Sequence, residues 1–554
     1  MQKLTCAFFL TFLFFDSLFA LPAQKIIPPG SWAYQALSIV SREQGRVFFD
    51  DSSLTVAQMQ AMLRELDPAK LSDEGTLLFD ELGSYLDSPE PLAFNNDAFG
   101  IGVDWAFQLE GYYKTNSETG WIYDYHRRNP LARANVSLSL GPWLNAEMEP
   151  FVGMNEYAAT LHNNYINLPL DPVSQIDIHF PKWANLSAGI PMGKASGVHF
   201  AIGIGNDFWG RTRTGSIAFS EYPERINYGQ LTLYSPYVKY GAEVMQHQVN
   251  KYQYMHYLHF RFFKMITLSF TEGVMVNAPL ELRFLNPLAI FHGFESFKTY
   301  GDYNKELDAA DVEDPTHGSR IGSFFGVKLE VQPWKFMRFY GLFAMTQLQL
   351  GVEKTHWPTN LTPDALAFQG GAEFSLPFRQ GYWAFGLEGV YTYPFMYVLW
   401  DKNWSFYKQQ DEVDNATIRY WMGTPFGPDS IAATFWIGYH KLKTWSAEFS
   451  FLFAAQGERS GTDIFDTDDY RPTHEYYDVV VPPTGTPIYT YTFGLRGTYT
   501  PLPWLRFSFE PGYRILHNAA HIGGKTEKGF EFALTVSVRP RFGTPGFGTL
   551  ASAR

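Results

Sequence analysis

From Ile101 to the end of the chain, side chains alternate between apolar and polar with a period of two residues. A β-strand places residues i and i+2 on one face, so each such segment has one apolar and one polar face. The last predicted strand shows this with Phe530, Phe532, Leu534, Val536, Val538 and Phe542 on one face and Glu531, Ala533, Thr535, Ser537, Arg539 and Arg541 on the other. Because a soluble sandwich rarely buries so many charged groups, the pattern predicts a barrel with lipid outside and water inside.

The composition agrees with a surface that water does not fully cover. Aromatic residues make up 18% of the 554-residue chain and charged residues only 18%, against about 25% charged in soluble proteins. After the N-terminal segment no apolar run is long enough for a transmembrane helix, which leaves a closed barrel as the way to span lipid. The net charge of -13 disfavours binding to nucleic acid or anionic headgroups.

The N-terminus has the features of a secretory signal peptide over residues 1–20. Lys3 supplies the positive charge and an apolar stretch follows it, with cleavage expected after Ala20 or after Ala23. Cys6, the only cysteine, lies inside this segment, so the exported protein has no thiol chemistry. We therefore expect the mature chain to leave the cytoplasm for the outer membrane of a bacterium.

Residues 25–90 precede the alternating pattern and have helical periodicity instead. Three short apolar stripes are separated by turn or capping residues, and Thr55 with Gln58 makes a capping box before the second stripe. We predict a small α-helical domain on the periplasmic side of the barrel.

Residues 100–542 are predicted to form the barrel, followed by a tail over 543–554. Tight connections alternate with long ones, as in barrels with short periplasmic turns and long external loops. Parity counted from both ends requires an even strand number, and we obtain it by withdrawing Gln230–Tyr234, which leaves about 18 antiparallel strands. Residues 206–236 would then lie within or across the lumen.

No catalytic motif is found, so we expect neither enzymatic activity nor a cofactor. Gly524-Lys525-Thr526 resembles the end of a phosphate-binding loop, but Ala519 stands where its first glycine belongs. Asp463, Asp466 and Asp468 offer oxygen atoms to calcium, but their spacing fits no EF-hand. A solvated loop is the plainer interpretation, and no metal is predicted.

The polar face of the strands carries a ladder of both charges. Its members are Glu110, Arg133, Glu373, Glu388, Glu448, Arg496, Arg506, Glu510, Arg514 and Arg539. One interpretation is that these ions pair and fill the lumen of a plugged barrel. The other is a lining that contacts a polar or anionic solute.

Aromatic residues in the long loops form a second set of candidates. They are Trp121, Tyr123, Trp400, Trp404 and Tyr407, interleaved with Asp, Asn and Lys. Rings can cover the C–H face of a sugar while neighbouring polar groups bond its hydroxyls. The alternative is an interfacial girdle in contact with lipid headgroups.

Three stretches resemble the Wzi family of outer-membrane capsule-assembly proteins. The helical block is similar to that family's periplasmic bundle, and Phe325–Glu330 with Phe339–Gly341 look like its paired central strands. The segment containing Trp209, Gly210, Gly215 and Ser216 is similar to a glycine-rich family motif, although Arg211-Thr212 replaces its Pro-Gly. The resemblance implies a barrel that holds capsular polysaccharide at the cell surface.

Three functions therefore remain open. The first is binding or anchoring of surface polysaccharide by external loops over an occluded lumen. The second is a porin-like channel for small polar solutes, and the third is a structural or adhesive surface protein. Each implies outer-membrane lipid as surroundings and the barrel-assembly machinery as a partner during biogenesis, with no role for nucleic acid.

Overall fold

The computed structural model describes residues 22–96, 98–121, 129–154, 163–168, 176–177, 182–291, 321–349, 351–356, 362–399, 401–411, 417–467, 470 and 481–543. The predicted signal peptide and residues 544–554 of the predicted tail lie outside these ranges. No helix within them is both long and apolar enough to cross a membrane.

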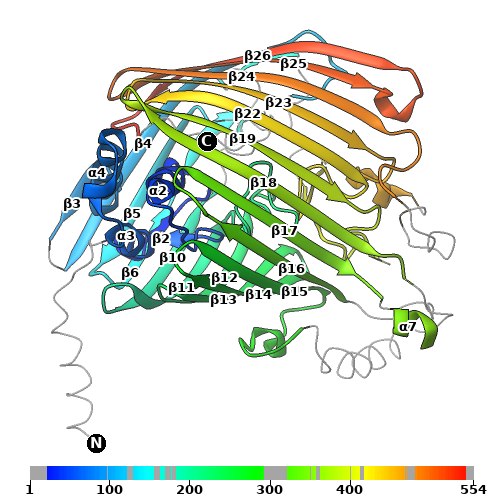
Figure 1. Cartoon of the computed structure of the whole chain (residues 1–554), viewed down its shortest axis with the longest axis horizontal. Coiled ribbons are helices and arrows are strands. Elements are labelled where there is room, and N and C mark those ends of the chain that lie inside the picture. The colour runs from blue at the N-terminus through cyan, green and yellow to red at the C-terminus, as the bar shows by residue number, and fades with distance from the viewer. Residues whose placement is uncertain are drawn as a thin grey trace, which may run out of the picture.

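The chain closes into an antiparallel barrel of 18 strands (Figure 1). In barrel order they are β4 (Phe99–Lys114), β5 (Ala132–Leu140), β6 (Leu144–Met148), β10 (Ala184–Met192), β11 (Ser196–Gly205), β12 (Ile226–Tyr234), β13 (Val238–Gln248), β14 (Lys251–Phe262), β15 (Ile266–Asn277), β16 (Ile321–Val331), β17 (Met337–Gln347), β18 (Ala365–Phe378), β19 (Gly381–Thr392), β22 (Ser430–Lys441), β23 (Trp445–Gln456), β24 (Ile488–Leu502), β25 (Leu505–His517) and β26 (Thr526–Val538). The last strand pairs with the first, Val536 opposite Leu109. The predicted fold class and strand number are confirmed.

The short strands lie at the rims or inside. β3 (Leu92–Asn95) extends the sheet beside the start of β4, and β1 (Ile26–Ile27) pairs with β2 (Leu54–Thr55). The long connection between β6 and β10 contains β7 (Phe151–Met154), β8 (Asn164–Ile166) and β9 (Ile176–Asp177). The connection between β17 and β18 contains the short helix α7 (Gly351–His356). β20 (Tyr407–Asp411) and β21 (Thr417–Trp421) form a separate hairpin between β19 and β22.

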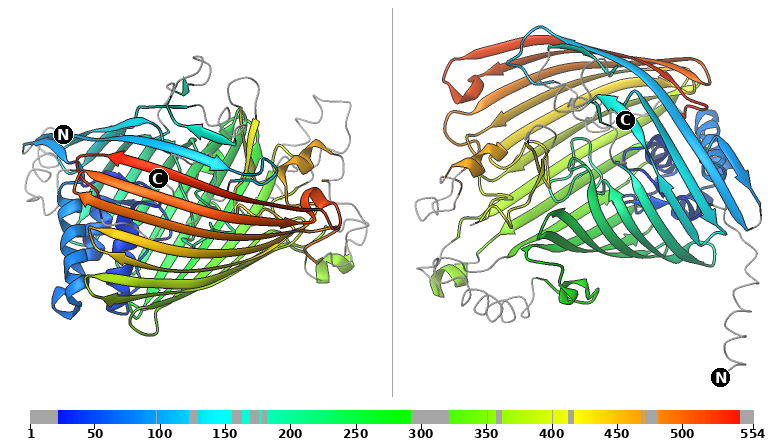
Figure 2. Two further views of the ribbon diagram at one scale, coloured as in Figure 1. Left: turned by 90° about the horizontal axis from the view of Figure 1, so that it is seen from above. Right: turned by 180° about the vertical axis from the view of Figure 1, so that it is seen from behind.

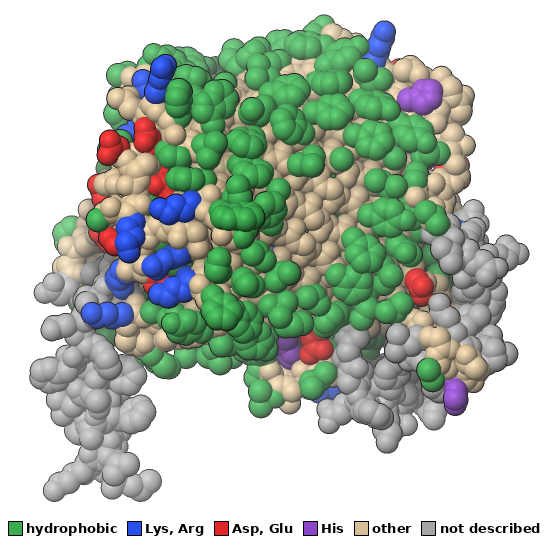
Figure 3. All heavy atoms as spheres, in the orientation of Figure 1, with side chains coloured by type: hydrophobic (Ala, Val, Ile, Leu, Met, Phe, Trp, Pro, Cys, Tyr) green, Lys and Arg blue, Asp and Glu red, His purple; other side chains and the backbone are tan. Residues whose placement is uncertain are grey.

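The alternation of side chains has the predicted facing. In β26, Phe530 and Leu534 are 39% and 48% exposed, whereas Glu531 and Thr535, which directly follow them, are buried. Figure 3 shows the result on one side of the barrel, a broad band of hydrophobic side chains with charged groups gathered near one end. Such a band is what a lipid-facing surface requires, because hydrocarbon solvates no charge.

Three helices lie at that charged end, which we call the helical end (Figures 1 and 2). They are α2 (Trp32–Glu43), α3 (Val56–Arg64) and α4 (Asp73–Asp87). The predicted capping box is present, because Gln58 N–H donates to Thr55 Oγ1 and Thr55 N–H donates to Gln58 Oε1, both at 3.3 Å. The helices share one apolar core with the barrel residues Tyr382 and Leu442, so the block packs on the barrel.

Two predictions about the chain path are wrong. Gln230–Tyr234 belongs to β12, which pairs with both β11 and β13, so only residues 206–225 of the predicted lumenal segment lie outside the barrel wall. Phe542 does not continue the outward face of β26. The strand ends at Val538, and the ring of Phe542 packs under the guanidinium groups of Arg506 and Arg539, with centroid distances of 4.3 and 5.7 Å.

Candidate functional site in the lumen

Three segments from distant parts of the chain enter the lumen and bond to one another. We call residues 22–55, 206–225, 395–399, 401–411 and 417–429 together the plug, the last three ranges forming its third segment. Gly210 N–H donates to Asp51 O at 2.8 Å, which joins the first two segments, and Ser220 N–H donates to Met422 O at 2.9 Å, which joins the second to the third. These two hydrogen bonds satisfy backbone polar groups of the plug away from water, as a buried segment requires.

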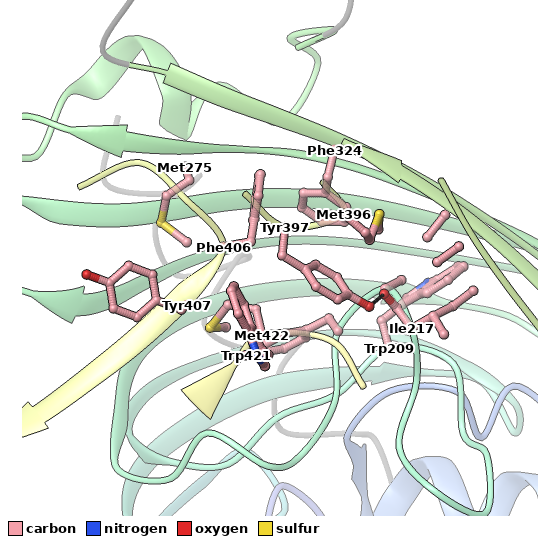
Figure 4. Close-up of a cluster of buried hydrophobic side chains, with 14 of the residues drawn as sticks. Trp209, Ile217, Met275, Phe324, Met396, Tyr397, Phe406, Tyr407, Trp421 and Met422 are labelled. Carbon is pink, nitrogen blue, oxygen red and sulfur yellow. Dashed lines mark hydrogen bonds between the residues drawn. The ribbon is translucent and has the colours of Figure 1, made fainter. Parts of the chain in front are cut away.

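An apolar cluster fills the space between the plug and the strands (Figure 4). Trp209 and Ile217 from the second segment meet Tyr397, Trp421 and other residues of the third, all of them buried. The hydroxyl of Tyr397 donates to Ile217 O at 2.5 Å, so the one polar atom of that ring is also satisfied. The plug is therefore packed like a protein interior rather than lying loosely in water.

Buried ion pairs fasten the plug to the wall. The Lys328 ammonium on β16 contacts Asp51 of the plug and lies 3.0 Å from Glu330 on the same strand. The guanidinium of Arg338 on β17 is 2.8 Å from Glu330, and Arg211 of the plug is 2.7 Å from Asp50. These pairs join the N-terminal segment, the second plug segment and two neighbouring strands.

Asp50, Asp51 and Glu330 bring carboxylate oxygens within 4.8 Å of one another, a spacing that suits a metal ion. Burial raises the pKa of Asp50, while the positive charge of Arg211 opposes that shift. Because Lys328 and Arg338 also pair with this group, its negative charge is already balanced by the protein's own cations. The arrangement is that of an ion-pair cluster rather than a metal centre.

The segment that resembles a glycine-rich motif of the Wzi family lies in the second plug segment. Gly210 and Gly215 have φ angles of 85° and 95°, which favour glycine. A Cβ on Gly215 would also lie 2.9 Å from the ring of Tyr222. The tight path turns the backbone N–H groups of Arg213 and Thr214 toward Glu388 of β19, at 2.8 and 3.0 Å.

Eight of the ten residues of the predicted charge ladder fall into two groups in the structure. Members of the first group bond to the plug: Glu373 lies 3.1 Å from Arg42 and Glu448 lies 2.5 Å from Arg213, while Glu388 holds the motif backbone. Two further members bond locally at the opposite, loop end. Glu110 accepts a hydrogen bond from Thr535 at 2.6 Å, and Arg514 donates to the carbonyl of Trp121 at 3.2 Å.

The second group surrounds a polar cavity of about 280 Å³ between the plug and strands β24–β26 and β4–β6. Its ladder members are Arg133, Arg496, Arg506, Glu510 and Arg539. Residues Lys25, Trp32, Tyr85 and Glu90 line the side formed by the plug and the helices. The sequence placed the ladder residues on the lumenal face but gave no sign that five of them share one cavity.

Two of the five predicted loop aromatics lie where a glycan cannot stack on them. Trp404 and Tyr407 are buried in the apolar cluster, and Tyr407 stacks on Phe465 at 4.4 Å. Trp121 is half-buried, with Lys114 5.5 Å from its ring centroid. Tyr123 and Trp400 lie outside the described residues.

The acidic loop shows no calcium-like grouping where it is described. Asp466 makes two hydrogen bonds with Arg419, at 2.9 and 3.1 Å, and that contact holds the pKa of Asp466 below its usual value. Asp468 lies outside the described residues.

Sequence reasoning also missed Lys328 and Arg338, although their places on the polar face of alternating segments could have revealed them.

Comparisons with known proteins agree with the fold. No family model matches the sequence, and no curated protein matches it. Among solved structures, Wzi of Escherichia coli, an outer-membrane protein involved in group 1 capsule assembly and described as a carbohydrate-binding β-barrel, matches with a TM-score of 0.56 at 11% identity, covering 92% of this chain and 98% of that one. OprD of Pseudomonas aeruginosa gives a TM-score of 0.39 at 9% identity, with 79% and 93% covered. The chain has the fold of outer-membrane barrels and resembles Wzi in its overall architecture.

Proposed function

We propose that this protein is an outer-membrane barrel that binds or anchors surface polysaccharide. The observation that carries the proposal is the packed lumen, in which three bonded segments and a buried apolar cluster occupy the path that a diffusion channel would need. A barrel built in this way suits holding a ligand better than conducting one. The similarity of its fold to a barrel described as carbohydrate-binding supports the same class of ligand.

In this proposal residues 1–20 are removed on export, the helical end lies in the periplasm and the long loops face outward. The apolar band contacts lipid, and the barrel-assembly machinery inserts the chain. Capsule assembly would be the cellular process, with the polymer held at the cell surface.

The test joins a genetic and a biochemical measurement. A deletion strain should lose part or all of its cell-bound glycan and shed it into the medium, and the purified protein should bind that glycan in a pull-down assay. A strain that keeps its surface glycan fully, together with purified protein that binds none, would refute the proposal.

A channel for small polar solutes is the second candidate, favoured by the charged cavity beside the plug. Planar-bilayer recording separates the two functions. The packed plug predicts no steady open steps, whereas stable conductance that a polar solute blocks would support the channel.

A further inference from the structure

We propose that the polar cavity at the helical end is a binding site for an acidic saccharide, whose carboxylate is held by Arg506. The inference deepens the proposed function. It rests on that function for the choice of a saccharide as the ligand, whereas the carboxylate site at Arg506 is argued from the structure. The cavity has the mixed lining of a ligand site, because charged groups, amides, hydroxyls and aromatic rings all contribute to it. Its volume of about 280 Å³ is at the lower end of ligand pockets, which suits one or two sugar residues.

The charges of the cavity are already paired, with one exception. Arg133 lies 2.6 Å from Glu149, Arg539 contacts Asp104 and Arg496 lies 3.6 Å from Glu510. Lys25 lies 2.8 and 2.7 Å from Glu90 and Glu147, the remaining carboxylates of the lining. Every acidic group of the cavity therefore has a basic partner.

Arg506 is the basic group left over. Its Nε donates to Thr500 Oγ1 at 3.1 Å and one terminal nitrogen donates to Gly543 O at 2.7 Å. Among the described residues no carboxylate oxygen lies within 4.0 Å of it, although the charge of Glu81 acts on it from farther away. A guanidinium that spends two donors on neutral oxygens keeps others for a ligand, and a carboxylate is the partner that its fork fits.

The ring of Phe542 fixes the direction of this guanidinium. Arg506 lies over that ring, and the N–H of Phe542 donates to Pro503 O at 3.2 Å, which anchors the segment that carries it. The guanidinium is therefore held in place before any ligand arrives. Preorganisation of this kind reduces the entropy lost on binding.

The remaining lining suits a sugar ring. Trp32 and Tyr85 contact each other edge to face at a centroid distance of 5.2 Å and form the aromatic part of the lining. Across from them, Gln108 and Ser537 make a polar pair at 3.3 Å, flanked by the amide of Asn135. Aromatic rings cover the C–H faces of a sugar, and amides and hydroxyls bond its O–H groups.

The experiment compares three purified full-length barrels in detergent: the native protein, Arg506→Gln and Arg514→Gln. Arg514 is a matched control, because it lies on the same strand and loses the same charge but does not line the cavity. Binding of trigalacturonate, maltotriose and inorganic phosphate is measured by isothermal titration calorimetry. Heat-dependent gel mobility confirms that each variant is folded.

The native protein should bind trigalacturonate at least about tenfold more tightly than maltotriose, because a charge-assisted hydrogen bond contributes that much or more. Arg506→Gln should weaken trigalacturonate binding by about tenfold or more and leave maltotriose unchanged, while Arg514→Gln should match the native protein. Equal binding by native protein and Arg506→Gln, or no binding by either, would overturn the proposal. Competition by phosphate at equal concentration would overturn the saccharide assignment.

Failure here can be told apart from failure of the proposed function. If the protein binds the cell's own polysaccharide but not trigalacturonate, the cavity proposal falls and the proposed function stands. If trigalacturonate binds through Arg506 but the deletion strain keeps its surface glycan and the protein binds none of it, the proposed function falls alone.

Discussion

Replacement of Lys328 by Met tests whether buried ion pairs hold the plug in the barrel. The Lys328 side chain is 0% exposed and its ammonium contacts Asp51, which is 1% exposed, and Glu330. After the substitution Glu330 keeps Arg338 at 2.8 Å. Asp51 keeps the backbone N–H of Arg211, at 3.2 Å, as its one side-chain hydrogen bond among the described residues, and the charge of Lys239 acts on it from farther away.

A buried carboxylate that loses its cation costs about 3–5 kcal/mol. The cost should fall on the docking of the plug rather than on the barrel, because β16 pairs with β15 and β17 through backbone hydrogen bonds that the substitution does not remove. Hydrogen exchange followed by mass spectrometry measures this locally. Amides of residues 47–55 and 206–216 should exchange about two to four orders of magnitude faster, while those of β16 and β17 keep their protection.

Two further variants make the prediction sharp. Lys328→Met combined with Asp51→Leu removes both charges and should recover most of the lost protection, because no unpaired carboxylate is left. Arg419→Gln breaks the exposed pair with Asp466 and should change the free energy of local opening, measured by exchange, by less than about 1 kcal/mol. Unchanged exchange of the plug in Lys328→Met, or uniform loss of protection around the whole barrel, would refute the reasoning.

Three other substitutions test other parts of the fold. Val536→Arg places a charge in the apolar band and should lower the free energy of unfolding by about 2–4 kcal/mol, measured by urea unfolding from liposomes. Thr535→Arg places the charge in the lumen beside Glu110 and should lower it by less. Equal losses would contradict the predicted facing. Burial raises the pKa of Glu90, but the positive charge of Lys25 outweighs burial and holds that pKa below the ordinary 4.5. The stability that this pair gives to the docked N-terminal segment should therefore be fully present above pH 4.5 and decrease as pH falls further. Proteolysis of the N-terminal segment against pH checks this, and Glu90→Gln should remove the dependence. Thr55→Ala removes the capping box of α3 and should cost about 0.5–2 kcal/mol, seen as faster exchange in that helix alone.

The strand number of about 18 was reached by withdrawing Gln230–Tyr234, a segment that is part of the barrel wall. The alternating pattern itself was enough to predict the barrel and its facing. It failed at β12, where the polarity is reversed at the start of the strand. Ile226 and Tyr228 point inward and are buried, while Asn227 points outward. The plug supplies apolar partners for the inward residues, and a pattern that assumes a watery lumen cannot anticipate them.

The aromatic residues of the third plug segment failed for a related reason. Trp404 and Tyr407 lie between two strands, and position in the sequence suggested an external loop. Whether such a connection turns outward or folds back depends on its long-range partners, among them Trp421 and Phe465. Those partners are 14 or more residues away and show no periodic relation to it, so local patterns carry no information about the contact.

The charge ladder illustrates how one sequence feature can serve two purposes. On the side of β16–β19 and β23 the plug reaches the wall, and Lys328, Glu373 and Glu448 bond to it directly. On the side of β24–β26 and β4–β6 a gap remains, and the charges there bond mainly to one another around the cavity. Filling of the lumen, one of the two interpretations left open by the sequence, therefore describes the first arc, and ligand contact is what we propose for the second. Lys328→Met should consequently speed hydrogen exchange in the plug without abolishing trigalacturonate binding. Arg506→Gln should weaken trigalacturonate binding while the amides of the plug keep their protection from exchange.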